Sequence, residues 1–522
     1  MSTSRGSRLF VPLVTAGALV AAGAGAYLRA AQSIEHESTE RDPLEGGLEQ
    51  IERASDLATD ESSPTAEALP LPARVDAIVV GGGPSPDANQ LSLEEDVRLA
   101  VETFGEGSVA LFAGGPGTRS VQVADLEPRG DALVSEIGEL LAPRSGRDAH
   151  YRETTLALHG AGTLPQLESL LEHALAQPGP PLTVYVAGHG DGGESPVDTR
   201  VLFWGGDALD AITLAEWLDA RTPTRPVRFV VTSCFSGGLG EMVFAGADRT
   251  RGVTTQDRCG LFATTWDEEA SGCDPDPERA HHDGFGVHFL MALRGLDRDG
   301  ADHRDEIDLD HDGTLGLYEA LTHARIASRS IDIPITTSEI YLRAVTPPPP
   351  ERASEGVASA PALPEQTAVI EALLPAMGLS GRAELERRLD ETRARKAEHD
   401  AAMEEASAAA DERYFALSAE LLSRWPVLDD PFHPDFQATL ERERPALERY
   451  FEASPTVRRY LEADDELSAM GSVDLAMRLE LSLLRRLEMA YETVELAGRL
   501  ASVGGPAWER YQALRACEQG AP

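Results

Sequence analysis

The sequence predicts an α/β domain built on a mostly parallel sheet flanked by helices, followed by an all-α C-terminal domain. Between residues 73 and 345, short apolar runs alternate with segments of helical periodicity. Runs that are apolar on both faces are typical of parallel strands buried between helices. From residue 365 onward the pattern is almost entirely helical, and a Pro-rich linker at 346–364 separates the two parts.

The apolar runs and the helix signals can be placed in order along the chain. Strands are expected at 75–80, 108–113, 182–188, 227–232 and 259–265. A capping box of Ser92 and Glu95 predicts a helix over 92–104, and Thr163 with Pro165 predicts one over 163–177. The glycines at 81–83 lack the GxGxxG spacing, so a dinucleotide site is not expected.

The C-terminal domain, 365–522, is expected to form a helical bundle or an antiparallel hairpin. Its first long helix should run over 382–425 and end at Pro426. Further helices are expected at 436–452, 455–469, 473–502 and 505–517. No catalytic constellation is visible in this part of the sequence.

The N-terminal residues predict export. An uncharged segment at 9–28 follows Arg5 and Arg8, is about long enough to span a bilayer, and favours a cytoplasmic N-terminus. The Ala-Gly-Ala at 24–26 also fits a signal-peptidase site. Residues 1–31 are therefore either a signal anchor facing the periplasm or extracellular side, or a signal peptide of a secreted protein. Residues 32–72 are acidic and polar, which predicts a disordered linker.

The formal net charge of −42 limits the partners. Nucleic acids and anionic lipid surfaces both repel such a chain, so binding to either through charge is not expected. Calcium and protein or peptide substrates remain compatible with it.

Two reactive side chains follow two of the predicted strands. His189 comes directly after the run at 182–188, and Cys234 follows the run at 227–232. The ends of neighbouring parallel strands meet at one edge of a sheet, where open α/β folds place their sites. A thiol and an imidazole at that edge form a nucleophile and its acid–base partner. The amides of Gly190 and Cys234 are candidates to bind the oxyanion of a tetrahedral intermediate.

The residues after Cys234 indicate a tight turn and include a second possible nucleophile. Gly237 and Gly238 are expected to let the chain turn tightly behind the cysteine. Ser236 is the alternative nucleophile, but 234–238 lacks the G-x-S-x-G pattern, so a turn residue is the favoured interpretation.

The segments Tyr-Val-Ala-Gly-His-Gly-Asp at 185–191 and Val-Val-Thr-Ser-Cys-Phe-Ser-Gly-Gly at 230–238 resemble the caspase-like cysteine peptidases, which include legumain, metacaspases, gingipains and separase. The segment 262–273 is similar to the legumain stretch after the next strand. The resemblance covers roughly residues 73–345, and the peptidases that it points to are of the exported bacterial type. It implies a caspase-like domain that cleaves peptide bonds, with His189 as acid–base, Cys234 as nucleophile and no required third catalytic residue.

The resemblance also bears on the substrate pocket. Legumain has an Arg-His pair where 84–90 has no basic residue, so a preference for Asn or Asp is not implied. Asp283 lies near the place of a pocket aspartate in legumain, and an acidic pocket would favour Arg or Lys in the substrate. Asp267 and Glu269 are further pocket candidates. A solvated acidic loop is the alternative interpretation of these carboxylates.

A second motif, at 308–319, matches the twelve-residue calcium loop. Calcium ligands are expected from Asp308, Asp310 and Asp312, from the Thr314 carbonyl and from Glu319. An exit helix is expected over 315–328, but the polar 297–305 does not predict an entry helix. We therefore expect one structural calcium loop rather than a paired sensor, with an unoccupied acidic turn as the alternative.

The other three cysteines leave a choice. Cys259 and Cys273 either form a disulfide in an oxidising compartment, stabilising the fold by about 3 kcal/mol, or stay as two free thiols. Cys517 has no evident partner.

Two functions follow from these patterns. The first is an exported cysteine endopeptidase with a calcium-stabilised catalytic domain. The second is a catalytically silent caspase-like protein that acts as a calcium-dependent envelope scaffold. The presence of both His189 and Cys234 favours the enzyme.

Overall fold

The computed structural model describes residues 67–126, 131–141, 149–278, 282–348, 361–430 and 433–521. The expected signal segment 1–31 and most of the expected linker 32–72 lie outside these residues. Within the described ranges, no helix combines the length and the apolar character that crossing a membrane requires.

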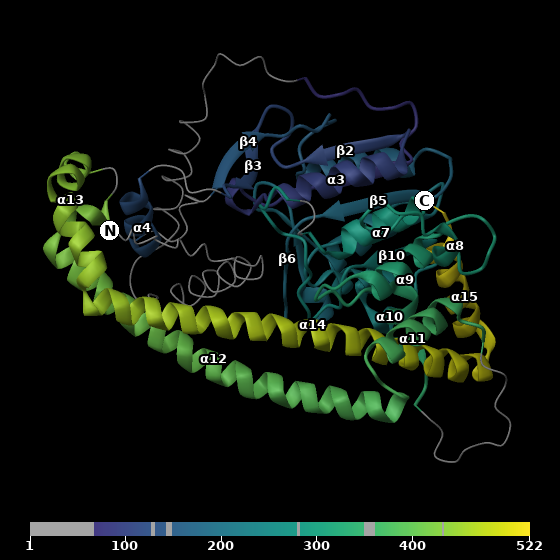
Figure 1. The fold of residues 1–522 in the computed structure, drawn as a ribbon. Coiled ribbons are helices and arrows are strands. Elements are labelled where there is room, and N and C mark those ends of the chain that lie inside the picture. The colour runs from purple at the N-terminus through teal and green to yellow at the C-terminus, as the bar shows by residue number, and fades with distance from the viewer. Residues whose placement is uncertain are drawn as a thin grey trace, which may run out of the picture. The chain divides into compact units, whose positions relative to one another are not determined.

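A six-stranded sheet lies at the centre of the α/β part, in the order β11–β10–β9–β5–β1–β2. Figure 1 labels three of its strands, β2, β5 and β10. Five of its strands are parallel: β1 (Ala77–Gly81), β2 (Ser108–Phe112), β5 (Leu182–Ala187), β9 (Val227–Val231) and β10 (Arg258–Phe262). The short β11 (Ile335–Thr336) pairs antiparallel with β10. The five predicted strands are therefore confirmed, each within a few residues of its expected bounds.

Helices cover both faces of this sheet. One face packs on α5 (Leu164–Leu175) and α6 (Ala211–Asp219), and the other packs on α3 (Leu91–Phe104), α7 (Phe285–Leu293) and α9 (Leu317–Ala327). Successive strand residues alternate between the two cores: Val184 and Val186 face the first, and Tyr185 faces the second. Each such side chain contributes about 1.5–3 kcal/mol by leaving water, which explains the uninterrupted apolar runs.

Two smaller sheets flank the central one. β3 (Arg119–Ala124) pairs antiparallel with β4 (Ala149–Glu153). β6 (Gly190–Asp191), β7 (Arg200–Leu202) and β8 (Ala208–Asp210) form an antiparallel sheet that begins one residue after His189. The amide of Leu202 donates to the carbonyl of His189 over 3.0 Å, so this sheet holds the histidine backbone in place.

The remaining helices are α4 (Ala132–Leu141), α8 (Arg304–Ile307), α10 (Thr337–Val345), α11 (Pro364–Ala376), α12 (Arg382–Arg424), α13 (Phe436–Ala453), α14 (Pro455–Val503) and α15 (Gly505–Gln519). Helix α14 is continuous where the sequence predicts a break at 470–472. Ser92 also differs from expectation: it lies inside α3, whose N-cap is Gln90, and its hydroxyl accepts from the Asp274 amide over 2.8 Å.

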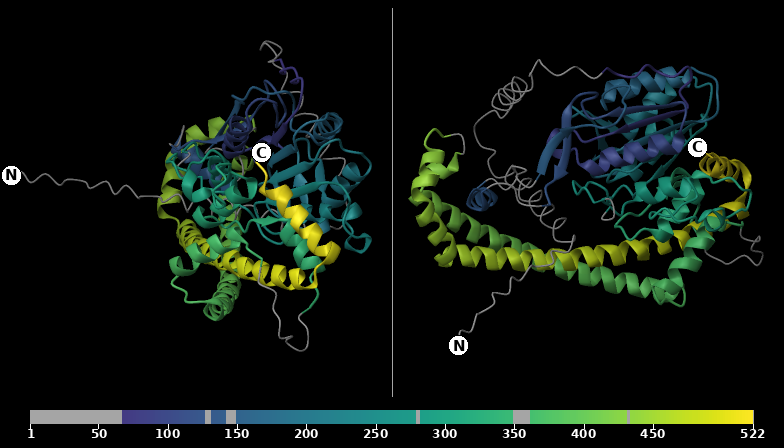
Figure 2. Two further views of the ribbon diagram at one scale, coloured as in Figure 1. Left: turned by 90° about the vertical axis from the view of Figure 1, so that its right-hand side faces the viewer. Right: turned by 45° about the horizontal axis from the view of Figure 1, so that its top comes forward.

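The chain forms two compact units, and their bounds differ from the expected domains. Of the described residues, the larger unit contains 67–126, 149–278, 282–348, 361–394 and 478–521, and the smaller one contains 131–141, 395–430 and 433–477. Much of the expected helical domain thus belongs to the α/β unit, because its helices bury apolar faces there. Tyr341 of α10, for example, shares a core with Leu500 of α14 and Leu514 of α15. Figure 2 shows α15 against the α/β core from two further directions.

The smaller unit has a helical core of its own. Its buried side chains come from α4, the second part of α12, α13 and the start of α14, and include Leu140, Leu421, Leu440, Leu447 and Val457.

A disulfide joins Cys259 of β10 to Cys517 of α15, with Cα atoms 6.2 Å apart and 258 residues between them in sequence. Both alternatives drawn from spacing, a Cys259–Cys273 bridge and two free thiols, are therefore wrong. The expectation that Cys517 has no partner is also wrong. The partner is hidden from the sequence because α15 returns to β10 only through tertiary packing. Cys234 and Cys273 are the free thiols.

Candidate active site

The register of β5 and β9 brings His189 and Cys234 to one edge of the sheet. Val186 of β5 pairs with Val231 of β9, and each reactive residue stands three positions further along. Both side chains are half-buried. The backbones also touch: a Cβ at Gly190 would overlap the carbonyl oxygen of Cys234. Glycine is needed at 190 for this close approach.

The chain reverses sharply behind Cys234, but not at the glycines. Phe235 adopts a left-handed φ of 57°, and a 3-10 helix follows at Ser236–Val243. A non-glycine residue in this region costs about 1–3 kcal/mol and persists only where the surroundings impose it. Gly238 serves packing instead, because a Cβ there would overlap Thr199 Oγ1. Ser236 is 1% exposed, and its Oγ accepts from the Thr264 amide over 3.4 Å, so it is a buried turn residue.

Two acceptors set the tautomer of His189. Its Nε2 lies 2.8 Å from the carbonyl oxygen of Ala88 and 3.0 Å from Gln90 Oε1. Because both partners can only accept here, Nε2 carries the proton, and a neutral ring has its lone pair on Nδ1. Burial lowers the pKa of His189, and the bond to Ala88 partly offsets this. The ring is therefore neutral at pH 7 and able to accept a proton at Nδ1.

The sulfur of Cys234 rests against the loop after β10. The amide of Ala270 donates to Sγ over 3.3 Å, and the carbonyl of the same residue lies 3.6 Å from Sγ. Burial, followed by the nearby Cys273 thiol, raises the pKa of Cys234 to about 12. The resting cysteine is thus a thiol, and attack requires that a base remove its proton.

A second thiol lies at the same site. Cys273 Sγ is 3.6 Å from His189 Nδ1, and the residue is exposed. The sequence predicts Cys273 as either a disulfide partner or a free thiol, and not as a residue of the site. Its position in the segment 262–273, which follows the strand next to that of Cys234, is the signal that could have placed it at the site.

The three carboxylates expected in the substrate pocket all have cationic partners within the chain. Glu269 pairs with Arg478 over 2.5 Å, and Asp267 lies 3.9 Å from Arg485, both arginines standing on α14. Glu269 and Asp267 therefore face α14, a helix that the sequence predicts to belong to a separate domain.

Asp283 also has its partners within the chain. It accepts from His288 Nε2 over 2.6 Å and lies 3.4 Å from Arg298. Burial is the largest single influence on the pKa of Asp283 and raises it, but the hydrogen bond and charge of His288, together with the charge of Arg298 and an Arg329 backbone bond, leave the pKa below its usual value.

The acidic loop has part of the geometry of a calcium site. Carboxylate oxygens of Asp308, Asp310 and Asp312 lie within 4.8 Å of one another. Gly313 has a φ of 82°, as the sharp turn requires. Glu319 instead accepts from the amides of Leu309 over 2.7 Å and Gly316 over 2.8 Å.

The segments on either side of this loop agree with the sequence only in part. The expected exit helix is present as α9 (Leu317–Ala327), while α8 before the loop is a single turn, Arg304–Ile307. The three aspartates fit a hard divalent cation. Each carboxylate oxygen of Glu319 already accepts one amide, which leaves one lone pair on each for a cation.

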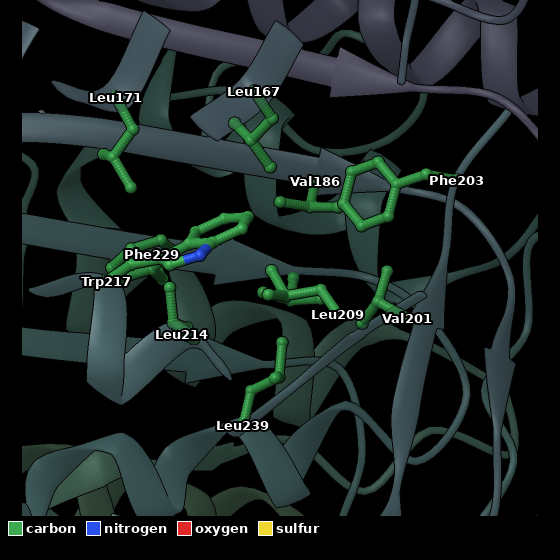
Figure 3. Close-up of a pocket in the computed structure, with 11 residues that line it drawn as sticks. Leu167, Leu171, Val186, Val201, Phe203, Leu209, Leu214, Trp217, Phe229 and Leu239 are labelled. Carbon is green, nitrogen blue, oxygen red and sulfur yellow. The ribbon is translucent and has the colours of Figure 1, made fainter. Parts of the chain in front are cut away.

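Two hollows lie away from the two thiols. One is a void of about 10 Å³ inside the core between the sheet and α5 and α6, lined only by apolar side chains such as Leu167, Phe203 and Phe229 (Figure 3). It holds at most about one water molecule and offers no polar partner. The other, about 490 Å³, lies beside the acidic loop and is lined by His288, His303 and His323 among others.

Comparison of the chain with models of known protein families and with curated proteins finds no match.

Proposed function

We propose that this protein is a caspase-like cysteine endopeptidase that uses His189 and Cys234. The observation that carries the proposal is the pairing of β5 with β9, which ends both strands at one edge, together with a tautomer of His189 that leaves Nδ1 as a base. A neutral thiol and a neutral imidazole at one sheet edge suit general-base activation.

The reaction follows from these protonation states. Nδ1 of His189 takes the proton from Cys234 Sγ as the sulfur forms a bond to the substrate carbonyl carbon. The amides of Gly190 and Cys234 would bind the resulting oxyanion. The imidazolium then gives its proton to the departing amine, and the C–N bond breaks. Water, deprotonated by the same nitrogen, hydrolyses the thioester and restores the thiol.

Substrate preference is a separate part of the proposal. Cleavage after Arg or Lys would require the substrate to compete with His288 and Arg298 for Asp283. A panel of peptides that differ only at the residue before the cut tests this. Strong cleavage after Arg and Lys would support an acidic pocket, and strong cleavage after Ala or Leu alone would remove Asp283 from it.

We further propose that the protein works outside the cytoplasm and that calcium at Asp308, Asp310 and Asp312 stabilises the fold. The Cys259–Cys517 disulfide supports an oxidising compartment. The convergence of three carboxylates supports calcium, which would supply charge neutralisation to the loop and no chemistry to the reaction.

A thiol-reactive peptide probe tests the nucleophile. We expect the probe to label the wild-type chain and Cys273→Ala, but neither Cys234→Ala nor His189→Ala. Intact mass should show one adduct. Cys273→Ala is the matched control because its sulfur is a second free thiol, 3.6 Å from His189 Nδ1.

Two outcomes would contradict the assignment. Labelling that is lost only in Cys273→Ala would transfer the nucleophile to that residue. No labelling of the folded wild-type chain by any peptide probe would favour the calcium-dependent scaffold.

A further inference from the structure

A buried aspartate organises the loop that touches the proposed nucleophile. Asp332 is completely buried, with 0% of its surface exposed. One carboxylate oxygen accepts from the Ser271 amide over 2.6 Å, and the other accepts from the Phe285 amide over 2.7 Å and from Ser330 Oγ over 2.8 Å. The single carboxylate thus ties the loop after β10 to the start of α7.

The bond to Ser271 acts on the peptide next to the sulfur. The carbonyl of Ala270, 3.6 Å from Cys234 Sγ, and the amide of Ser271 belong to one planar peptide unit. When Asp332 holds the N–H of that unit, it also sets the direction of the C=O. The Ala270 amide, which donates to Sγ, is one residue earlier on the same loop.

Helix α14 holds the aspartate from the other side. Arg486 is 2% exposed, and its Nε donates to the carbonyl of Asp332 over 2.7 Å. Its two other nitrogens donate to the carbonyls of Arg325, Ser328 and Ser330 over 2.8–3.0 Å. A guanidinium with a rigid fork of donors can fix several carbonyls at once, which lysine cannot.

We infer that Asp332 is a positioning residue for Cys234, and that Arg486 of α14 holds it in place. The inference rests on the proposed role of Cys234 as nucleophile. It makes the C-terminal helix part of the catalytic apparatus: Arg486 holds Asp332, Asp332 holds the Ser271 amide, and the loop so fixed presents the neighbouring Ala270 N–H to the sulfur. No step of it requires Asp332 to touch substrate.

Alkylation of Cys234 by iodoacetamide at about pH 8 tests the inference without a peptide substrate. The background is Cys273→Ser, in which Cys234 is the one free thiol because Cys259 and Cys517 are bonded. We expect Asp332→Asn to slow alkylation about tenfold, because a loosened loop no longer holds the Ala270 N–H on the sulfur, and loss of that hydrogen bond to the thiolate lowers the thiolate fraction by about that factor.

The direction in which the alkylation rate changes distinguishes a positioning role of Asp332 from a simple effect of its charge. Removal of a nearby negative charge alone would favour the thiolate and speed alkylation. A faster or unchanged rate in Asp332→Asn would therefore overturn the inference. Arg486→Lys serves as the second variant, because it keeps the charge and loses the fork. It should slow alkylation in the same direction, and an unchanged rate in a folded Arg486→Lys chain would also count against the inference.

Glu365→Gln is the matched control. Glu365 is 2% exposed and is held by Arg515 over 2.6 Å and Gln519 over 2.7 Å, with no link to Cys234. It should lower the melting temperature and leave the alkylation rate unchanged. Slower alkylation in this control would show that general loosening, not positioning, explains the effect.

Failure of the proposed function remains distinguishable. If the wild-type chain cleaves no peptide but Asp332→Asn slows alkylation, the positioning inference stands and the peptidase proposal falls. If cleavage is present, the Asp332→Asn chain should lose kcat with little change in KM.

Discussion

Replacement of Cys517 by serine removes the bond between α15 and β10 and should lower stability by several kcal/mol. The bridge closes a loop of 258 residues, for which the chain-entropy model gives about 5.5 kcal/mol as an upper value. Cys517 is a better site for this change than Cys259, which is fully buried, because serine at 259 would also bury an unpaired hydroxyl.

The folded state should change little in this variant, because α15 is held by other contacts. Tyr511 and Leu514 are each 1% exposed, and Glu518 accepts from Thr337 Oγ1 and the Ser338 amide, both over 2.6 Å. The loss therefore arises mainly in the unfolded chain. For a unit of this size, 1 kcal/mol corresponds to about 1.5 °C, so we expect the melting temperature to fall by about 3–7 °C.

Thermal unfolding with and without reductant measures this. The wild-type chain with reductant should melt like Cys517→Ser, and the variant should not respond to reductant. Thiol titration of the denatured, unreduced wild-type chain should count two thiols, Cys234 and Cys273. Four thiols, or identical melting of both chains without reductant, would refute the reasoning.

Three further outcomes are expected. Millimolar calcium should raise the melting temperature by a few degrees in the wild-type chain and not in Asp310→Asn; equal shifts in both would remove the calcium assignment. Burial alone would raise the pKa of Glu94, but hydrogen bonds from Arg152, Thr154 and Thr155 outweigh it and leave the pKa low. The ionised Glu94 side chain therefore contributes to the free energy of unfolding above the unfolded-state pKa of about 4.3, and this contribution is lost as the pH falls through the lower pKa of the folded state. Glu94→Gln should accordingly lose less stability than the wild type when the pH is lowered. Because burial lowers the pKa of His189, the acidic limb of kcat/KM should lie below about pH 6.5, and a limb above that value would exclude His189 as the base.

The central sheet was predictable because its signal is local. Each strand is a short run whose residues are buried on both faces, so composition alone marks it. Once β5 and β9 are known to be parallel neighbours, the meeting of His189 and Cys234 needs no further information. The same locality explains why the long helix ending at Arg424 was placed correctly: Pro426 lies just beyond it.

The features that the sequence did not predict share a different cause: they depend on contacts between residues far apart in the chain. Ser92 matches a capping box in sequence, yet its hydroxyl accepts from the Asp274 amide, 182 residues away. Helix α14 continues through Gly471, where a break was expected, because one glycine costs only about 1 kcal/mol inside a long helix. The sequence offers two interpretations of the pocket carboxylates, a solvated loop and an acidic pocket for a basic substrate residue, and neither includes the arginines of 478–486.

The same contacts argue that residues 478–522 and the α/β core form one functional piece. A separate appendage would meet the core through exposed polar surfaces, since an interface that opens must tolerate water on both sides. Here the contacts are buried and polar at once: Arg486 satisfies four backbone carbonyls, and Glu518 satisfies a hydroxyl and an amide. Removal of either helix would leave those groups without partners, at about 1–3 kcal/mol for each one that stays dry. An arrangement of this kind is hard to open and close, so it favours a permanent structural role for the C-terminal helices at the proposed site over a role as a detachable partner-binding arm.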